Sequence, residues 1–229
     1  MNLYVIGGHS GDEAVMAGAL AHKYVSHGHK VFFVSMTNGD GGHPTLSREA
    51  YRIQKDREAA MAAQSLGAEC ILYPCSSGAL NVGEEATGFL AELFRKSPPD
   101  LVITHWRGTI HRDHEAAHWN TIRTLKQSDF SEVPLYFAEN WEDKKGFLPD
   151  LWLSVDETDI EAWEKACSCF QFFRDSFYKF SYRTYYRNLF QIHGLESRSA
   201  SGFAVVLMQH CILRHRIVNE IPDVPLEYK

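Results

Sequence analysis

Short, continuous apolar runs alternate with longer segments of helical character as far as residue 155. The runs predict buried strands, and the segments between them predict helices. A strand that is apolar throughout is typical of a parallel sheet covered on both faces. The pattern therefore predicts an α/β fold: a Rossmann-like, doubly wound, mostly parallel sheet with helices on both faces. The predicted strands are 2–7, 30–36, 69–73, 101–105, 133–138 and 151–155, and the predicted helices are 12–26, 47–66, 83–96 and 112–126, the second capped by Gly67.

The pattern changes after residue 155. Residues 159–190 have helical character and are rich in phenylalanine, tyrosine and tryptophan. We expect one domain over residues 1–229, in which residues 159–229 form an aromatic-rich helical extension packed on the sheet. The same aromatic region is a candidate for closing a cleft or for an interface in a homo-oligomer. Residues 221–225, with two prolines, are expected to be irregular.

Two polar clusters stand where a predicted strand gives way to a helix. Residues 7–13 (GGHSGDE) follow the first strand, and residues 111–114 (HRDH) come shortly after the fourth. Ligands of such sheets lie beyond the carboxyl ends of the strands, so both clusters are expected at one edge. Two imidazoles and one carboxylate suit zinc with an open coordination position. The sequence thus indicates a hydrolytic metal site.

Composition excludes several other classes of function. The net charge of −6 argues against a nucleic-acid partner held by bulk electrostatics. The five cysteines form no C-x-x-C pair, which favours a reducing, cytoplasmic setting over a disulfide framework. No apolar run approaches the roughly 20 residues that span a bilayer, so no membrane association is expected.

The two clusters resemble the signatures of the LmbE-like/PIG-L family of zinc-dependent N-acetylglucosaminyl deacetylases. That family carries His-Pro-Asp-Asp-Glu at the end of a strand and His-Pro-Asp-His further on. The matching segments here are 9–13 and 111–114, and residues 37–43 and 147–151 resemble later family segments. The resemblance covers about residues 2–165. It implies that zinc-activated water removes an N-acyl group, such as N-acetyl, from an amino sugar or a similar small molecule.

The resemblance also implies roles for individual residues. His9, Asp12 and His114 match the family's zinc ligands. His111 matches the imidazole that stabilises the oxyanion of the tetrahedral intermediate. Asp113 would orient a neighbouring histidine.

One departure concerns the proton acceptor. The family's general base is the first aspartate of the first signature, and this chain has Gly11 there. Loss of a general base typically costs on the order of 10²- to 10⁴-fold in rate. Asp113, Asp40 and Glu13 are the nearest carboxylates by sequence, and Asp113 is our choice for this role. The alternatives are a reaction that proceeds with less help, or a homologue that binds metal and ligand without turnover.

Further departures concern the substrate. Lys55 stands where relatives carry an arginine that holds the substrate, and Asp40 and Arg112 are two more candidate substrate-binding residues. Residues 73–78 lack the aspartate that many relatives use to bind sugar hydroxyls. The sequence therefore supports a metal site more strongly than it supports a sugar substrate. A nucleotide-sugar binding module without metal is a third hypothesis.

Overall fold

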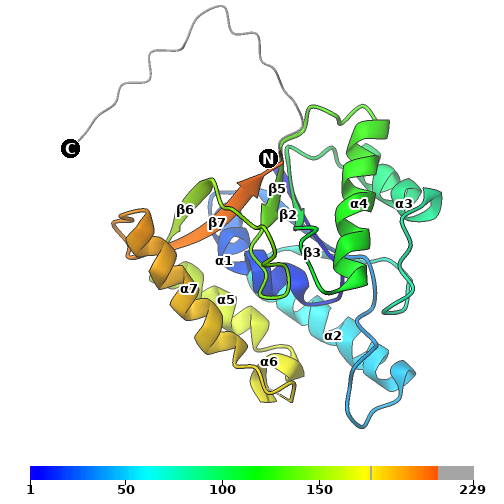
Figure 1. Ribbon diagram of the computed structural model, residues 1–229, viewed down its shortest axis with the longest axis horizontal. Coiled ribbons are helices and arrows are strands. Elements are labelled where there is room, and N and C mark those ends of the chain that lie inside the picture. Colours follow the sequence, from blue (N-terminus) through cyan, green and yellow to red (C-terminus); the bar gives the residue numbers. More distant parts are fainter. Residues whose placement is uncertain (176, 211–229) are drawn as a thin grey trace, which may run out of the picture.

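A seven-stranded sheet forms the centre of the part of the chain that the computed structural model describes, residues 1–175 and 177–210 (Figure 1). The strand order is β3-β2-β1-β4-β5-β7-β6. The first five strands pair in parallel, whereas β7 is antiparallel to both of its neighbours. The predicted mostly parallel α/β sheet is therefore confirmed. The strands are β1 (Asn2–Gly7), β2 (Lys30–Ser35), β3 (Glu69–Leu72), β4 (Leu101–His105), β5 (Leu135–Ala138), β6 (Leu151–Val155) and β7 (Phe203–Gln209).

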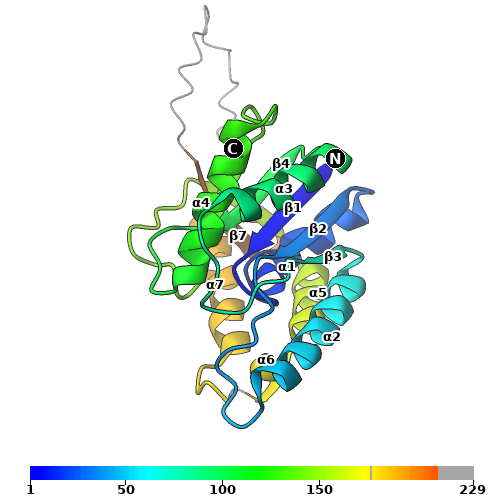
Figure 2. The same ribbon diagram turned by 90° about the vertical axis from the view of Figure 1, so that its right-hand side faces the viewer.

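Helices cover both faces of the sheet (Figure 2). One face packs against α1, α2, α5 and α7, and the other packs against α3 and α4. Successive residues of β1 show the consequence, since Leu3 and Val5 enter the first core and Tyr4 and Ile6 the second. The helices are α1 (Asp12–Ser26), α2 (Arg48–Leu66), α3 (Glu84–Lys96), α4 (Arg112–Gln127), α5 (Glu157–Cys167), α6 (Gln171–Asp175) and α7 (Tyr182–Glu196).

Local capping explains why the boundaries of helix α2 could be predicted from the sequence. The Ser47 side chain accepts a hydrogen bond from the amide of Ala50 at 3.2 Å and so begins α2. Gly67 ends the same helix in the left-handed region, at φ 73°. None of the described helices combines the length and the apolar composition needed to span a membrane.

The prediction of a helical extension over residues 159–229 is wrong in one respect. Helices α5, α6 and α7 are present, but β7 then returns to the sheet and lies between β5 and β6. Its run of apolar residues from Phe203 to Met208 is buried in the middle, as a strand with neighbours on both sides requires. The expectation of an irregular segment at 221–225 falls outside the described residues.

Candidate metal centre

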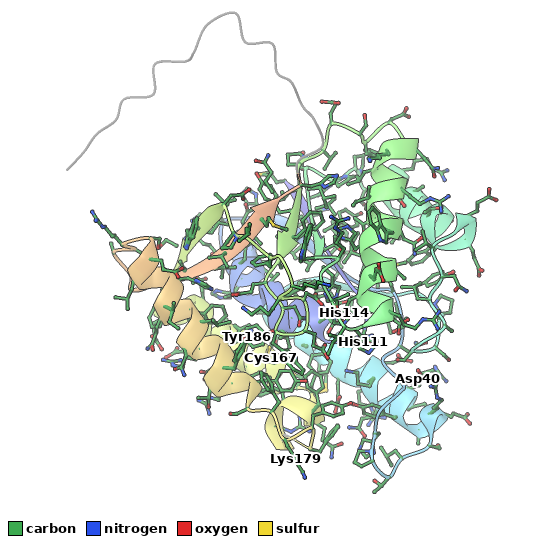
Figure 3. The ribbon with its side chains drawn as sticks, in the orientation of Figure 1. Asp40, His111, His114, Cys167, Lys179 and Tyr186 are labelled. Carbon is green, nitrogen blue, oxygen red and sulfur yellow. The ribbon has the colours of Figure 1, made fainter. Side chains whose placement is uncertain are left out.

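Three connections at the carboxyl edge of the sheet build the site. Strands β1 and β4 are neighbours, so the β1–α1 and β4–α4 connections lie side by side. Strand β5 is next to β4, which brings the β5–β6 connection to the same edge. Figure 3 shows His111 and His114 together at the beginning of α4, on the side that faces α1.

The structure brings the three predicted ligands together. Nδ1 of His9 lies 3.1 Å from Nε2 of His114 and 3.1 Å from Oδ2 of Asp12. The third side of this triangle, from Nε2 of His114 to Oδ2 of Asp12, is 3.2 Å. Ligand atoms about 2.1 Å from a tetrahedral zinc ion lie about 3.4 Å from each other. The donor set and its spacing therefore fit a zinc ion with one position left open.

The ring nitrogens that point away from this triangle are held by carboxylates. Nε2 of His9 lies 3.1 Å from Oδ2 of Asp113, which also accepts a hydrogen bond from the amide of Gly78 at 2.5 Å. Nδ1 of His114 lies 3.0 Å from Oδ1 of Asp143. Such partners fix the tautomer and the orientation of a metal-binding imidazole. The contacts of Asp113 match the orienting role that the resemblance implies.

His105 and Asp143 pack against the predicted ligands, and Nε2 of His105 lies 3.3 Å from Oδ2 of Asp12, close enough for Asp12, His105 and His114 to form a second group that could hold a metal ion. Nδ1 of His105 lies 2.7 Å from Oδ2 of Asp143, and its Nε2 accepts a hydrogen bond from the amide of Gly8 at 2.9 Å. The His105 ring also stacks on His114, with 3.8 Å between ring centres. His105 is the last residue of the predicted strand 101–105, and nothing in the sequence pattern marks Asp143.

Replacing Asp143 with asparagine is expected to weaken zinc binding by about 10- to 100-fold, because His114 loses its carboxylate partner. Competition with a chromophoric chelator measures this affinity. The matched control is Asp150→Asn in the same connection, whose carboxylate is exposed and accepts a hydrogen bond from the amide of Gln209. Equal affinities for the two variants would contradict an orienting role for Asp143.

A cavity of about 490 Å³ is lined by two of the three donors, His9 and Asp12, whereas His114 lies buried behind them. Its lining residues include two carboxylates, Asp12 and Glu142. Oε2 of Glu142 lies 3.8 Å from Nε2 of His114, and the side chain is 22% exposed. Burial raises the pKa of Glu142, as does the neighbouring Asp12, against an opposing effect of His114. The sequence analysis missed Glu142, and only the adjacency of β4 and β5 could have suggested it. The rest of the lining consists mainly of glycines and aromatic residues. The glycines are Gly39, Gly41 and Gly42, and the aromatic residues are Tyr51, Trp141 and four residues between 172 and 182.

His111 lines the cavity as the residue preceding α4. Its ring centre lies 4.3 Å from that of His9 and 4.9 Å from that of His114. Burial lowers the pKa of His111 to about 4, with a further contribution from His9. The imidazole is therefore neutral at pH 7, with one N–H to donate.

The three predicted substrate-binding residues are placed differently. Lys55 lines the cavity. Asp40 lies outside the lining, where its Oδ1 accepts a hydrogen bond from the amide of Ser77 at 2.7 Å (Figure 3). Arg112 is exposed and does not line the cavity either. The structure thus brings Lys55 to the site, and it does not bring Asp40 or Arg112.

The space beside Gly11 is occupied by aromatic rings. Gly11 precedes α1 with φ 112°, a conformation that disfavours other residues. A Cβ atom at this position would lie 3.2 Å from ring carbons of both Phe170 and Phe172. The space beside Gly11 is therefore filled by two phenylalanine rings from the C-terminal aromatic region.

The fold and the site together define an α/β protein with a two-histidine, one-carboxylate centre at the edge of a parallel sheet. The family model described as PIG-L, GlcNAc-PI de-N-acetylase, matches residues 4–124, which is more than half of the chain. The protein belongs to the PIG-L family. None of the curated protein sequences matches the chain.

Solved structures share the fold at low sequence identity. The chain is similar to GalB, the 4-carboxy-2-hydroxymuconate hydratase of Pseudomonas putida KT2440, with a TM-score of 0.80 at 18% identity over 96% of this chain and 99% of that one. It is similar to the N,N'-diacetylchitobiose deacetylase of Pyrococcus horikoshii, with a TM-score of 0.73 at 18% identity over 91% and 83%. The zinc-inhibited form of teicoplanin deacetylase Orf2 gives a TM-score of 0.70 at 14% identity over 93% and 100%. Deacetylases and a hydratase therefore share this architecture.

Proposed function

We propose that the protein is a zinc-dependent hydrolase that removes an N-acyl group, such as N-acetyl, from an amino sugar or a similar small molecule. The observation that carries this proposal is the triangle of His9, Asp12 and His114 donor atoms, 3.1 to 3.2 Å apart, beside a cavity. Membership of a de-N-acetylase family and the two deacetylases of the same fold support it. Bound zinc would lower the pKa of a water molecule and polarise the acyl carbonyl.

The histidines and their carboxylate partners have separate roles in this proposal. Asp113 and Asp143 hold His9 and His114 in the orientation in which their near nitrogens converge. His111 lines the cavity next to both rings and is neutral at pH 7. Its N–H is the donor that we assign to the carbonyl oxygen as negative charge develops there.

Glu142 is the proton acceptor that the contacts favour. Asp113 is fully buried, and its Oδ2 is already engaged by His9 and by the Gly78 amide. Glu13 accepts a hydrogen bond from the Gly11 amide and lies outside the cavity lining. Glu142, in contrast, presents its carboxylate to the cavity within 3.8 Å of His114.

The proton transfers then balance with one carboxylate. Glu142 takes a proton from the attacking water as the carbon–oxygen bond forms, and it gives that proton to the nitrogen as the carbon–nitrogen bond breaks. The products are a carboxylic acid and a free amine. The sequence favours Asp113 for this role because it is the signature carboxylate not assigned to the metal, but its Oδ2 is engaged by His9 and by the Gly78 amide.

The direct test is release of acetate from a panel of N-acetyl amino sugars and N-acetyl amino acids by zinc-loaded protein, with chelator-treated protein as the control. Zinc-dependent release from at least one compound is expected. A protein that holds zinc and binds these compounds without hydrolysing any would instead be the metal- and ligand-binding homologue that Gly11 suggests. Because fold alone does not choose between hydration and hydrolysis, a second assay follows the loss of the carbon–carbon double bond of an unsaturated carboxylate, the reaction type of the hydratase with the same fold.

Restoring the family's aspartate by Gly11→Asp is expected to give no gain of hydrolysis. The backbone at Gly11 disfavours a side chain, and the Phe170 and Phe172 rings fill the adjacent space. We expect a loss of about 1–3 kcal/mol in the free energy of unfolding, measured by chemical denaturation. Gly11→Ala is the matched control and should lose a similar amount. A large gain of amide hydrolysis in Gly11→Asp would show that the wild type lacks only its base.

A further inference from the structure

Lys55 is a buried cation on the wall of the cavity. It lies in the middle of α2, and only 4% of the residue is exposed. Within residues 1–175 and 177–210 it forms no ion pair and no hydrogen bond. An ammonium group carries three N–H donors, and burying it without an acceptor is costly. The ammonium group therefore offers its N–H donors to whatever occupies the cavity.

Aromatic rings hold the ammonium group in place. Nζ lies 4.5 Å from the ring centre of Phe172, 4.8 Å from that of Phe170 and 6.0 Å from that of Tyr51. Such contacts offset only part of the cost of burying a charge. Burial lowers the pKa of Lys55 to about 8, against the opposing effects of Asp12, Glu58 and Glu13, so the group is mostly charged at pH 7.

The ammonium group is also close to the predicted zinc ligands. Gly39, with φ 66°, separates the two: a Cβ atom there would lie 2.8 Å from Cε of Lys55 and 3.5 Å from Cβ of His9. A small molecule with its acyl group at the triangle of donors would therefore have another of its groups within reach of Lys55. The cavity that Lys55 and His9 both line also has aromatic walls, with Tyr51 and Phe172 among their residues.

We infer that Lys55 binds a carboxylate of the substrate, so that the molecule hydrolysed is an N-acylated carboxylic acid with an apolar body rather than a neutral amino sugar. The inference rests on the proposed function, because it places the charge on the molecule that loses its acyl group. Phosphate esters share the required chemistry, an anionic oxygen, and form a separate arm of the test.

The test uses pairs of compounds that differ in charge. N-Acetylphenylalanine and its C-terminal amide form the carboxylate pair, and N-acetylglucosamine 6-phosphate and N-acetylglucosamine form the phosphate pair. Isothermal titration calorimetry measures their binding to zinc-loaded protein, and again after chelator treatment, which excludes direct binding of the anion to the metal. We expect the wild type to bind the carboxylate at least about tenfold more tightly than the amide in both states.

Two variants test whether Lys55 causes the preference for the carboxylate. Lys55→Met keeps an unbranched stem without the charge and should bind acid and amide equally, whereas Lys55→Arg should keep the preference. Thermal unfolding checks that both variants fold. Equal binding in the wild type, or a preference that survives in Lys55→Met, would overturn the inference. A preference confined to the phosphate pair would overturn the carboxylate assignment.

The binding readout does not depend on turnover. If the Lys55-dependent preference is present but no N-acyl compound is hydrolysed, the proposed function fails and the anion site stands. If hydrolysis occurs without the preference, the inference fails and the proposed function stands.

Discussion

Replacing His114 with alanine is expected to abolish stoichiometric zinc binding. His114 is fully buried and supplies one corner of the donor triangle, and its removal leaves His9 and Asp12 as the two remaining corners. Two donors do not complete even the three protein ligands of an open zinc site. Elemental analysis after dialysis against limiting zinc should find about one ion per chain in the wild type and none in the variant.

His27→Ala is the matched control, since His27 is an exposed histidine beyond the end of α1. This variant should retain zinc. His9→Ala should behave like His114→Ala. Full retention of zinc by both variants would remove the basis of the proposed function. Zinc lost from one variant only would mean that the other histidine is not a ligand.

Replacing Glu142 with glutamine is expected to lower kcat by on the order of 10²- to 10⁴-fold with zinc content unchanged. Glutamine keeps the size of the side chain but cannot accept the proton. Steady-state kinetics on the best substrate of the panel measures kcat, and elemental analysis measures zinc. Glu161→Gln, an exposed glutamate on α5, is the control that should leave both unchanged.

The same assay compares Glu142 with Asp113. Asp113→Asn should weaken zinc binding, because Asp113 contacts His9 rather than the cavity. If Asp113→Asn instead lost turnover at full zinc occupancy while Glu142→Gln kept its turnover, Asp113 would be the general base, as the sequence analysis predicts. Loss of zinc in Glu142→Gln would make Glu142 a ligand rather than a base.

The sequence predicted those features that depend on local pattern. The strand β1, the helix α1 and the cap Gly67 follow from apolar runs and from the preferences of glycine, which act over a few residues. His9, Asp12 and His114 were found because they belong to short signatures at strand ends. Their convergence then followed from β1 and β4 being neighbours in the sheet.

The features that the sequence did not predict depend on long-range packing. Glu142 and Asp143 reach the site because β5 lies beside β4, and no local motif marks them. Phe170 and Phe172 fill the space at Gly11 from about 160 residues away in the chain, a contact that only the folded core creates. Strand β7 was not predicted because its apolar run follows three helices, and a short apolar run there is equally compatible with another helix.

The position of β7 bears on when the centre can assemble during biosynthesis. Strands β5 and β6 are not paired with each other, and β7 joins them from the end of the described chain. The connection that carries Glu142 and Asp143 therefore lacks its final anchorage until Gln209 has left the ribosome. A nascent chain that already contains both signature segments therefore still lacks the strand that fixes the position of Asp143 beside His114.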